Sequence, residues 1–230
     1  MNNLRNQLGA YIKDAVYAAN DGIVTTFAVV AGVAGAALDP IIVLILGFAS
    51  LFADGFSMAS GNFLGSRSEV RVYERQRRAQ ENSLEENPQK ERGDIETILA
   101  SRGYEGEKLR EMLDLIMSNK EFAVDLMMDE EVHILKPEEG RPFRNALVTF
   151  FSFIAVGLVP LLPYLFVTES EAPFFYAVLF TVVVLFGVGA VRVIFMGGSW
   201  LWAGMEMLAV GGFAAAISYA IGAFLRGIIG

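Results

Sequence analysis

Residues 41–86 read IIVLILGFASLFADGFSMASGNFLGSRSEVRVYERQRRAQENSLEE, and this stretch decides the fold. Its first half, 41–65, is apolar over the roughly 20 residues that a helix needs to cross a bilayer core of about 30 Å. From Ser66 the chain is strongly charged, yet no glycine or proline interrupts it before Asn87-Pro88. A residue before proline disfavours helical backbone angles. We therefore predict one helix that crosses a membrane, continues into water and ends near Asn87.

Four further stretches have the length and apolar character of membrane spans: 15–38, 145–167, 173–195 and 200–225. Short turn-forming segments are expected to join the spans: Asp39-Pro40, 168–173 and 196–199. The sequence predicts an all-α membrane protein with five transmembrane helices and a small cytoplasmic helical domain between the second and third. The corresponding parts are 1–66, 67–144 and 145–230.

Charge is concentrated in the insert 67–144, which holds 14 of the 18 Lys and Arg residues and 19 of the 26 Asp and Glu residues. The rest of the chain is nearly uncharged, as membrane spans require. The formal net charge of −8 argues against a nucleic-acid partner. Because the chain has no cysteine, a metal site must use carboxylates, methionine, backbone oxygen or the single His133, which we interpret as a surface residue.

The orientation follows from the basic residues near the span ends, since cytoplasmic loops carry an excess of Lys and Arg. One side of the predicted spans has Arg5, Lys13, Arg67, Arg71, Arg141, Arg144 and Arg192. The other side has Asp39, Glu169 and Glu171, with Arg226 as the exception. We expect the N-terminus and the insert in the cytoplasm and the C-terminus outside. No signal-peptide pattern is present at the N-terminus, which with the short chain favours a prokaryotic inner membrane.

Two carboxylates and a methionine lie inside the apolar stretches. Asp21 lies in the first span, and Asp54 and Met58 lie one helical turn apart in the second. An ionisable group at bilayer depth costs roughly a few kcal/mol or more, so it is a hypothesis for a functional site. Carboxylate oxygen and thioether sulfur on one path suit a divalent transition metal. The alternatives are that Asp21 caps or bends a helix and that Met58 is ordinary core filler.

Three further features of the spans have a structural and a functional interpretation. Glu206 in the fifth span could titrate on an ion path or pair with Arg192. Gly61-x-x-x-Gly65 fits helix packing within the chain as well as a dimer face. Pro160 and Pro163, both in the segment 157–163, predict a kink in the third span. Transporters tolerate such a kink where a helix lines a cavity.

The insert reads as a small helical domain. Asp94 is expected to cap a helix that ends near Arg102, with Gly103 as its stop. Two more helices are expected near 105–118 and 120–132. The apolar positions that recur at helical spacing, and should form its core, are Ile95, Ile98, Leu99, Leu109, Leu113, Ile116 and Met117.

Four motifs occur in order along the chain: NDGIVTT at 20–26, SMA at 57–59, GLVPLLP at 157–163 and EML at 206–208. In these motifs and in the position of its insert, the chain resembles the vacuolar iron transporter (VIT1/CCC1) family, and we expect a bacterial or archaeal type of member. The resemblance covers essentially the full chain.

The resemblance implies a five-span homodimer in the lipid bilayer that exports Fe²⁺, and often Mn²⁺, from the cytoplasm in exchange for protons. Neither ion is a permanently bound cofactor, because both are substrates. The implied path follows the dimer interface and uses the positions of Asp21 and Met58. The resemblance also implies a metal-gathering cytoplasmic domain, whose Met-Met-x-x-Glu cluster is matched by Met127, Met128 and Glu131.

Two departures from the family pattern matter. Asn62 stands where a glutamate usually follows Met58 by four residues, whereas Asp54 precedes Met58 by four. These positions share one helical face, so we expect Asp54 to replace the missing ligand about 12 Å along the path. The extended second helix is also less acidic than usual, which argues against a high-affinity iron store. Its remaining glutamates at helical spacing are Glu74, Glu81 and Glu85, a pattern that any solvated helix also shows.

The leading hypothesis is a proton-coupled metal exporter whose path includes Asp21, Asp54, Met58, Asn62 and Glu206, with manganese as the alternative main substrate. A second hypothesis is a membrane-anchored metal sensor or adaptor, in which the insert binds metal and no ion crosses. Intramembrane proteolysis is disfavoured, because the two aspartates lack a Gly-x-Gly-Asp setting and no His-Glu-x-x-His occurs. We therefore do not expect an enzyme.

Overall fold

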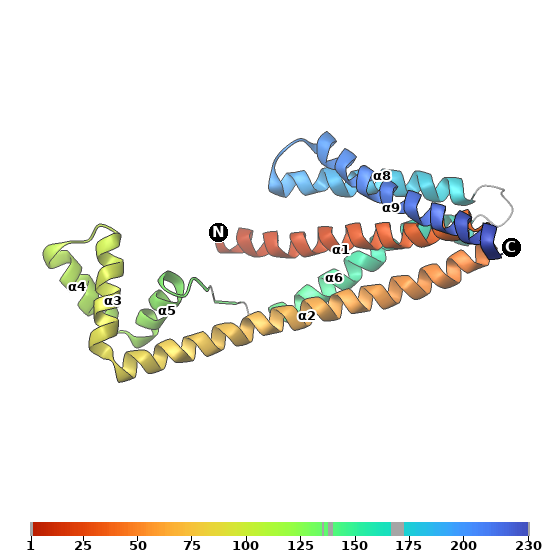
Figure 1. The fold of residues 1–230 in the computed structure, drawn as a ribbon. Coiled ribbons are helices and arrows are strands. Elements are labelled where there is room, and N and C mark those ends of the chain that lie inside the picture. The colour runs from red at the N-terminus through yellow and green to blue at the C-terminus, as the bar shows by residue number, and fades with distance from the viewer. Residues whose placement is uncertain (1, 135, 138–139, 167–172, 230) are drawn as a thin grey trace. The chain divides into compact units, whose positions relative to one another are not determined.

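The computed structural model describes residues 2–134, 136–137, 140–166 and 173–229. Within these ranges every regular element is a helix, as the sequence predicts (Figure 1). The chain forms two compact units. The membrane unit consists of Met1–Phe63 and Pro142–Gly230, and the insert unit consists of Leu64–Arg141.

Five helical stretches of the described chain are long and apolar enough to cross a membrane. Four of them are single helices: α1 (Asn2–Gly35), α2 (Pro40–Glu86), α8 (Pro173–Met196) and α9 (Trp200–Ile229). The remaining stretch consists of α6 (Arg141–Gly157), the 3₁₀ turn η1 (Val159–Leu161) and α7 (Leu162–Phe166). The protein is therefore an all-α membrane protein, and α2 runs on past its apolar half to Glu86 as one helix.

The interruption between α6 and α7 confirms the predicted kink. Pro160 lies in η1 and Pro163 in α7. A proline lacks the backbone N–H for the helical hydrogen bond, and its ring clashes with the preceding turn. Both prolines are buried, so the kinked segment is part of the core of the membrane unit.

Helix α1 packs against α8, α9 and η1. Its contact with α9 is close, because a Cβ added at Gly35 would lie 2.2 Å from the backbone oxygen of Tyr219. At Gly222 an added Cβ would lie 2.1 Å from the backbone oxygen of Gly32. Small residues therefore allow the backbones of α1 and α9 to approach closely at these positions.

The connections between the spans are short where they are described. α1 ends at Gly35 and α2 begins at Pro40, and the Asp39 carboxylate accepts a hydrogen bond from the Ile41 N–H at 2.9 Å. Gly197 and Gly198 join α8 to α9 with φ angles of 74° and 110°, which glycine adopts without strain. The predicted connection after the third span, with Glu169 and Glu171, lies at 167–172, outside the described residues.

The insert unit contains α3 (Pro88–Ser101), α4 (Gly106–Met117), α5 (Lys120–Glu130) and the C-terminal part of α2. One prediction here is wrong. Asp94 does not cap a helix but lies in the middle of α3, because Pro88 starts the helix six residues earlier with its fixed backbone angle. Gly103, with φ of 88°, follows α3 as the predicted stop.

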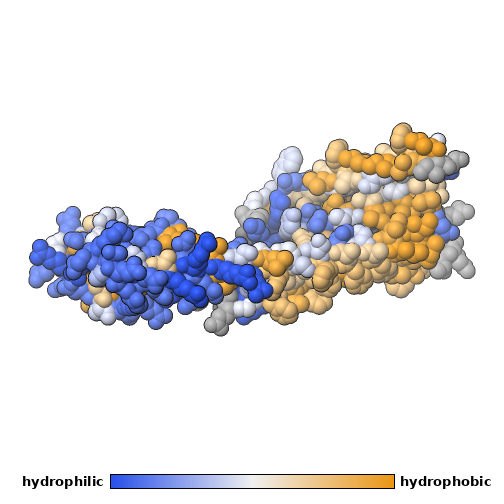
Figure 2. Space-filling view, turned by 60° about the horizontal axis from the view of Figure 1, so that its bottom comes forward, coloured by the Kyte–Doolittle hydropathy of each residue, from blue (hydrophilic) through white to orange (hydrophobic). Residues whose placement is uncertain are grey.

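The predicted core of the insert unit is confirmed at five of its seven positions, while Ile98 and Met117 are only partly buried. Its buried positions bring α3, α4 and α5 together and are Ile95, Leu99, Leu109, Leu113, Ile116, Ala123 and Met127. The surfaces of the two units follow the division of charge in the sequence. In the view of Figure 2 the membrane unit is mostly hydrophobic and the insert unit mostly hydrophilic. Large apolar side chains such as Phe56, Phe213 and Phe224 are exposed on the membrane unit, as on a surface that meets lipid.

Candidate functional site

Asp21 lies inside the unbroken helix α1 with its side chain half-buried. The alternative in which Asp21 caps a helix is therefore wrong. The glycine of Asn20-Asp21-Gly22 has a packing role instead, since a Cβ added at Gly22 would lie 2.4 Å from the backbone oxygen of Phe153. α1 and α6 thus meet at the turn of helix that carries the Asp21 carboxylate.

The second intramembrane carboxylate, Asp54, is exposed on α2 and accepts a hydrogen bond from the Ser50 hydroxyl at 2.5 Å. The negative charges of Asp54 and Asp21 interact. One turn along α2, Met58 is half-buried and packs against the apolar core of the membrane unit. The structure therefore places the two aspartates, on α1 and α2, near enough for their charges to interact, with Met58 on the adjacent turn of α2.

The next turn of α2 carries Asn62, which joins three spans. Its Nδ2 donates to the Thr149 hydroxyl of α6 at 2.7 Å and to the Asp14 carboxylate of α1 at 3.2 Å. Asp14 lies within the first span, Tyr11–Gly35, and Thr149 is 1% exposed. Neither residue was expected at the site from the sequence. Asp14 falls one residue before the predicted span, although its spacing of seven residues from Asp21 places both on one helical face.

Glu206 has a different environment from the aspartates. It is exposed on α9, and its Oε2 accepts a hydrogen bond from Nη2 of Arg192 on α8 at 2.8 Å. This ion pair is the alternative that the sequence left open for Glu206. It gives the carboxylate a fixed positive partner, so a titrating role on the ion path remains a prediction.

The glutamates on the extended part of α2 are dispersed. Glu81 pairs with Arg77 at 3.1 Å, and Glu85 pairs with Lys120 of α5. Glu74 is exposed. The helical spacing of these three residues does not bring them to one cluster.

Met127 and Met128 are both buried in the insert unit. Met127 is 0% exposed among the apolar side chains of α3 and α4, and Met128 packs with Tyr73 and Val124. In this arrangement both side chains pack the core. A role for their sulfur atoms as metal ligands remains a prediction.

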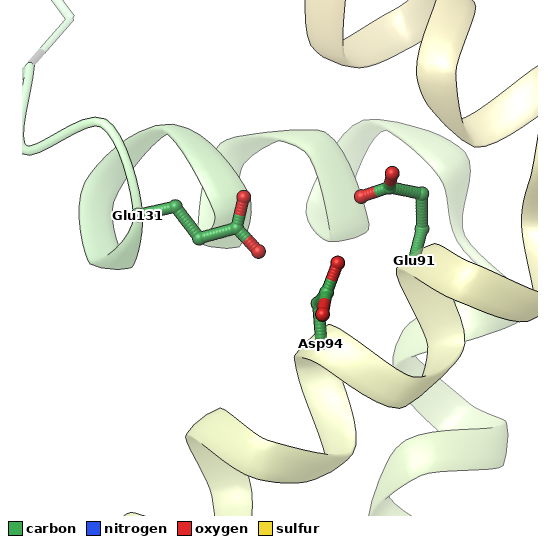
Figure 3. A group of neighbouring side chains, drawn as sticks. All are labelled: Glu91, Asp94 and Glu131. Atoms are coloured by element: carbon green, nitrogen blue, oxygen red, sulfur yellow. The ribbon is translucent and has the colours of Figure 1, made fainter.

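Glu131, at the end of α5, lies in a carboxylate cluster with Glu91 and Asp94 of α3. One oxygen from each residue lies within 4.8 Å of those of the other two, a spacing that could hold a metal ion. The three side chains point toward one another in Figure 3. Glu91 is 1% exposed and accepts a hydrogen bond from the Ser83 hydroxyl of α2 at 2.7 Å. Oxygen-only ligands of this kind suit hard or borderline divalent ions.

The negative charges of the cluster repel one another, and Lys90 is a basic neighbour of the cluster. Partial burial, and then the charges of Glu91 and Asp94, raise the pKa of Glu131 above its ordinary value. The Lys90 ammonium lies 3.1 Å from Glu91 and 3.4 Å from Asp94. Gln80 donates weakly to Glu131 at 3.5 Å. A metal ion that binds the cluster can therefore displace a proton or the Lys90 ammonium group.

Sequence reasoning found Glu131 but missed Glu91 and Asp94. The spacing of three residues puts both on one face of α3, which was the available signal. Assigning Asp94 to a helix cap concealed it, because this assignment left Glu91 outside any helix. The isolated imidazole of His133 is exposed, as expected, and its Nδ1 lies 3.1 Å from the backbone oxygen of Asp129.

Comparison with known families covers both units. The model of the VIT family matches residues 12–223. The chain belongs to the VIT family. This match includes Asp14, Asp21, Asp54 and Asn62, and all of the insert unit.

Three relatives illustrate the likeness. The chain is 28% identical over 211 residues to a vacuolar iron transporter of Centaurea cyanus, covering 92% of this chain and 86% of that protein. It is 29% identical to vacuolar iron transporter 1 of Oryza sativa subsp. japonica, covering 92% and 84%. It is 30% identical over 237 residues to a vacuolar iron transporter of Toxoplasma gondii (strain ATCC 50861 / VEG), covering 99% and 78%. These relatives are eukaryotic and give no support to our expectation of a bacterial or archaeal type.

Proposed function

We propose that this protein exports divalent transition-metal ions from the cytoplasm in exchange for protons, with Fe²⁺ as the main substrate and Mn²⁺ as a second. The observation that carries the proposal is that Asp21 and Asp54 lie within membrane spans, on α1 and α2, near enough for their negative charges to interact. Carboxylates at this depth are costly unless they serve an ion or proton. The names of the relatives, which are iron transporters, favour iron.

The path that we propose follows one face of α2. Asp54, Met58 and Asn62 succeed one another at intervals of one turn, and the charge of Asp21 on α1 interacts with that of Asp54. An Fe²⁺ ion is borderline between hard and soft, so a path of carboxylate and thioether ligands suits it better than Mg²⁺ or Ca²⁺. A proton that returns on the same carboxylates would couple the two movements.

A homodimer would complete this path. Asp54 is exposed on the apolar half of α2, and a carboxylate within a membrane span should not face lipid. A Cβ added at Gly61 or Gly65 meets no atom within 4 Å, so packing within the chain does not account for these glycines. Both observations support a second copy of the chain against this face of α2.

The insert unit would gather metal before transport. Its carboxylate cluster of Glu91, Asp94 and Glu131 supplies oxygen ligands, and Lys90 keeps the affinity moderate by neutralising part of their charge. A moderate affinity suits a loading site, because an ion that binds too tightly would not move on. We place the insert and the N-terminus in the cytoplasm and the C-terminus outside, and we retain a prokaryotic inner membrane as a prediction.

The carboxylate cluster also favours a second candidate function. A membrane-anchored metal sensor or adaptor would bind metal at Glu91, Asp94 and Glu131 and would carry no flux. Transport is preferred because a sensor has no use for the intramembrane aspartates Asp21 and Asp54.

The test is a flux measurement with the full-length protein in proteoliposomes. Fe²⁺ and Mn²⁺ uptake would be followed together with internal pH, under an imposed proton gradient, for the wild type and for Asp54→Ala. We expect metal uptake coupled to proton movement in the wild type and its loss in Asp54→Ala. Glu96→Ala, which removes an exposed carboxylate of the insert unit, is the matched control and should transport normally.

Absence of metal flux in the wild type, with metal still bound by the insert unit, would contradict the transporter and support the sensor. Metal flux without any change of internal pH would contradict proton coupling alone. Normal flux in Asp54→Ala would contradict the role given to Asp54.

A further inference from the structure

Asp14, Asn62 and Thr149 form a polar junction of three spans, of which the proposed path uses only Asn62. The amide nitrogen of Asn62 donates one hydrogen to the Asp14 Oδ2 and the other to the Thr149 Oγ1, at 3.2 and 2.7 Å. Thr149 is 1% exposed, and the side chains of Asp14 and Asn62 are half-buried. A carboxylate, an amide and a hydroxyl therefore converge from α1, α2 and α6 inside the membrane unit.

The junction and the pair Asp21 and Asp54 are separated by about the same length along α1 and along α2. Along α1, Asp14 precedes Asp21 by seven residues, which is two helical turns or about 10 Å. Along α2, Asn62 follows Asp54 by eight residues, or about 12 Å. Asp14 accepts a hydrogen bond from Asn62, and the charges of Asp21 and Asp54 interact, so α1 and α2 carry polar groups at two levels, with Met58 on the α2 turn between them.

The Asp14 carboxylate has no basic partner among the residues that the structure describes; its hydrogen-bond donor is the neutral amide of Asn62. A carboxylate without a basic partner is costly in a membrane span. Its attraction for an approaching cation is not reduced by a neighbouring positive charge. The –NH₂ group of Asn62 carries a partial positive charge and occupies the space between two oxygens. Turning this amide over would exchange Nδ2 for Oδ1 and offer a cation three oxygen ligands from three spans.

We propose that Asp14, Asn62 and Thr149 form a second station for a divalent transition-metal ion on the transport path, two helical turns from Asp21 and Asp54. The Asn62 amide holds the two oxygens in place while the station is empty. This inference rests on the proposed transport function and extends it, because it supplies a carboxylate at the level where Asn62 replaces the usual glutamate. That carboxylate comes from α1 and not from α2.

The test measures the concentration dependence of Mn²⁺ uptake by the full-length protein in proteoliposomes under a fixed proton gradient. In Asp14→Asn the new amide oxygen can still accept the hydrogen bond from Asn62, so folding and thermal stability should be unchanged. The charge is lost, and we expect KM for Mn²⁺ to rise by about tenfold or more, since even indirect partners of metal ligands change affinity by about 10–100-fold. Thr149→Val, which removes one neutral ligand, should have a smaller effect in the same direction.

A swapped pair distinguishes the charge from the hydrogen bond. Asp14→Asn combined with Asn62→Asp exchanges the carboxylate and the amide across the same contact, so the station regains one carboxylate. We expect KM to return to within about threefold of the wild type, less than the effect of losing a ligand. Asp39→Asn makes the same chemical change in the turn between α1 and α2, where an asparagine can keep the hydrogen bond to Ile41, and should leave KM unchanged.

A normal KM in Asp14→Asn would overturn the station, and so would a swapped pair as impaired as Asp14→Asn. These results differ from a failure of the proposed function. If the wild type carries no metal, transport itself is wrong. If Asp21→Asn abolishes uptake while Asp14→Asn leaves KM unchanged, transport stands and only the station at Asp14 is wrong.

Discussion

In the insert unit, acidic side chains commonly have a lysine or arginine beside them. Glu81 pairs with Arg77, Glu85 with Lys120, and Glu130 with Arg102 at 2.5 Å. In the membrane unit, within the part of the chain that the structure describes, the hydrogen-bond donors to Asp14 and Asp54 are an amide and a hydroxyl. Glu206 differs, since it pairs with Arg192 at 2.8 Å.

The difference indicates which carboxylates should bind a metal ion most strongly. An ion pair in water contributes little, and a carboxylate that already has a basic partner has little attraction left for another cation. A carboxylate with neutral donors in a low-dielectric region attracts a cation strongly. The membrane aspartates are therefore suited to carry ions, whereas the paired glutamates of the insert unit have little attraction left for one.

The largest effects should come from removing the charge of Asp21 or of Asp54. Asp21→Asn keeps the size of the side chain, and we expect the initial rate of Mn²⁺ uptake to fall by about 100-fold or more, beyond the range for indirect metal partners. Glu206→Gln makes the same change where Arg192 already compensates the charge, and should lower the rate by less than about threefold. Equal losses in the two variants would break the distinction between paired and unpaired carboxylates.

The next effect concerns metal binding by the insert unit. Combining Glu91→Gln, Asp94→Asn and Glu131→Gln should weaken Mn²⁺ binding by the full-length protein by at least about tenfold, as judged by calorimetry in detergent. The matched control combines Glu96→Gln, Glu107→Gln and Glu111→Gln, three exposed acidic residues of the same unit, and should bind as the wild type. An unchanged affinity in the first variant would remove the cluster from the loading step.

The pH dependence of this binding should reflect Glu131. Because burial and the charges of Glu91 and Asp94 raise its pKa, Glu131 keeps its proton at pH values where an ordinary glutamate has lost it. Metal must displace that proton, so affinity should rise with pH through the raised pKa and level off above it. Calorimetry of Glu131→Gln should show weaker binding with a flatter rise. A rise as steep as in the wild type would assign the proton to another group.

The smallest effect should come from Lys90. Lys90→Met removes the ammonium group that lies against Glu91 and Asp94, so Mn²⁺ affinity should increase, by about two- to fivefold for a contact this exposed. Lys108→Met removes an exposed lysine of α4 and serves as the control. Weaker binding in Lys90→Met would mean that the lysine organises the cluster and does not compete with the metal.

Local patterns predicted most of the fold. The apolar lengths located five spans, Asn87-Pro88 located the end of α2, and Gly103 located the end of α3. These signals act within one helix or one turn, so they can be read without knowing the tertiary structure. The predicted start of α3 was wrong, because Pro88 and Asp94 are both good helix-start signals and the proline lies first along the chain.

The candidate site was less predictable, because contacts between helices decide it. Asp21 and Asp54 stood out as charges in apolar stretches, and their interaction could not be derived from spacing alone. Glu91 is one acidic residue among many in the insert, and only the packing of α3 near α5 places it with Glu131. Asp14 follows Lys13 at the edge of the predicted span, and no sequence pattern indicated its contact with Asn62.

The central claim is that the unpaired membrane aspartates carry the ion and that the insert unit only loads it. The most direct measurement is the maximal rate of Mn²⁺ uptake at saturating metal, for Asp54→Asn and for the combined Glu91→Gln, Asp94→Asn and Glu131→Gln variant. We predict that the combined variant reaches the wild-type maximal rate, while Asp54→Asn stays at the level of empty liposomes. A wild-type maximal rate in Asp54→Asn, or its loss in the combined variant, would contradict the claim.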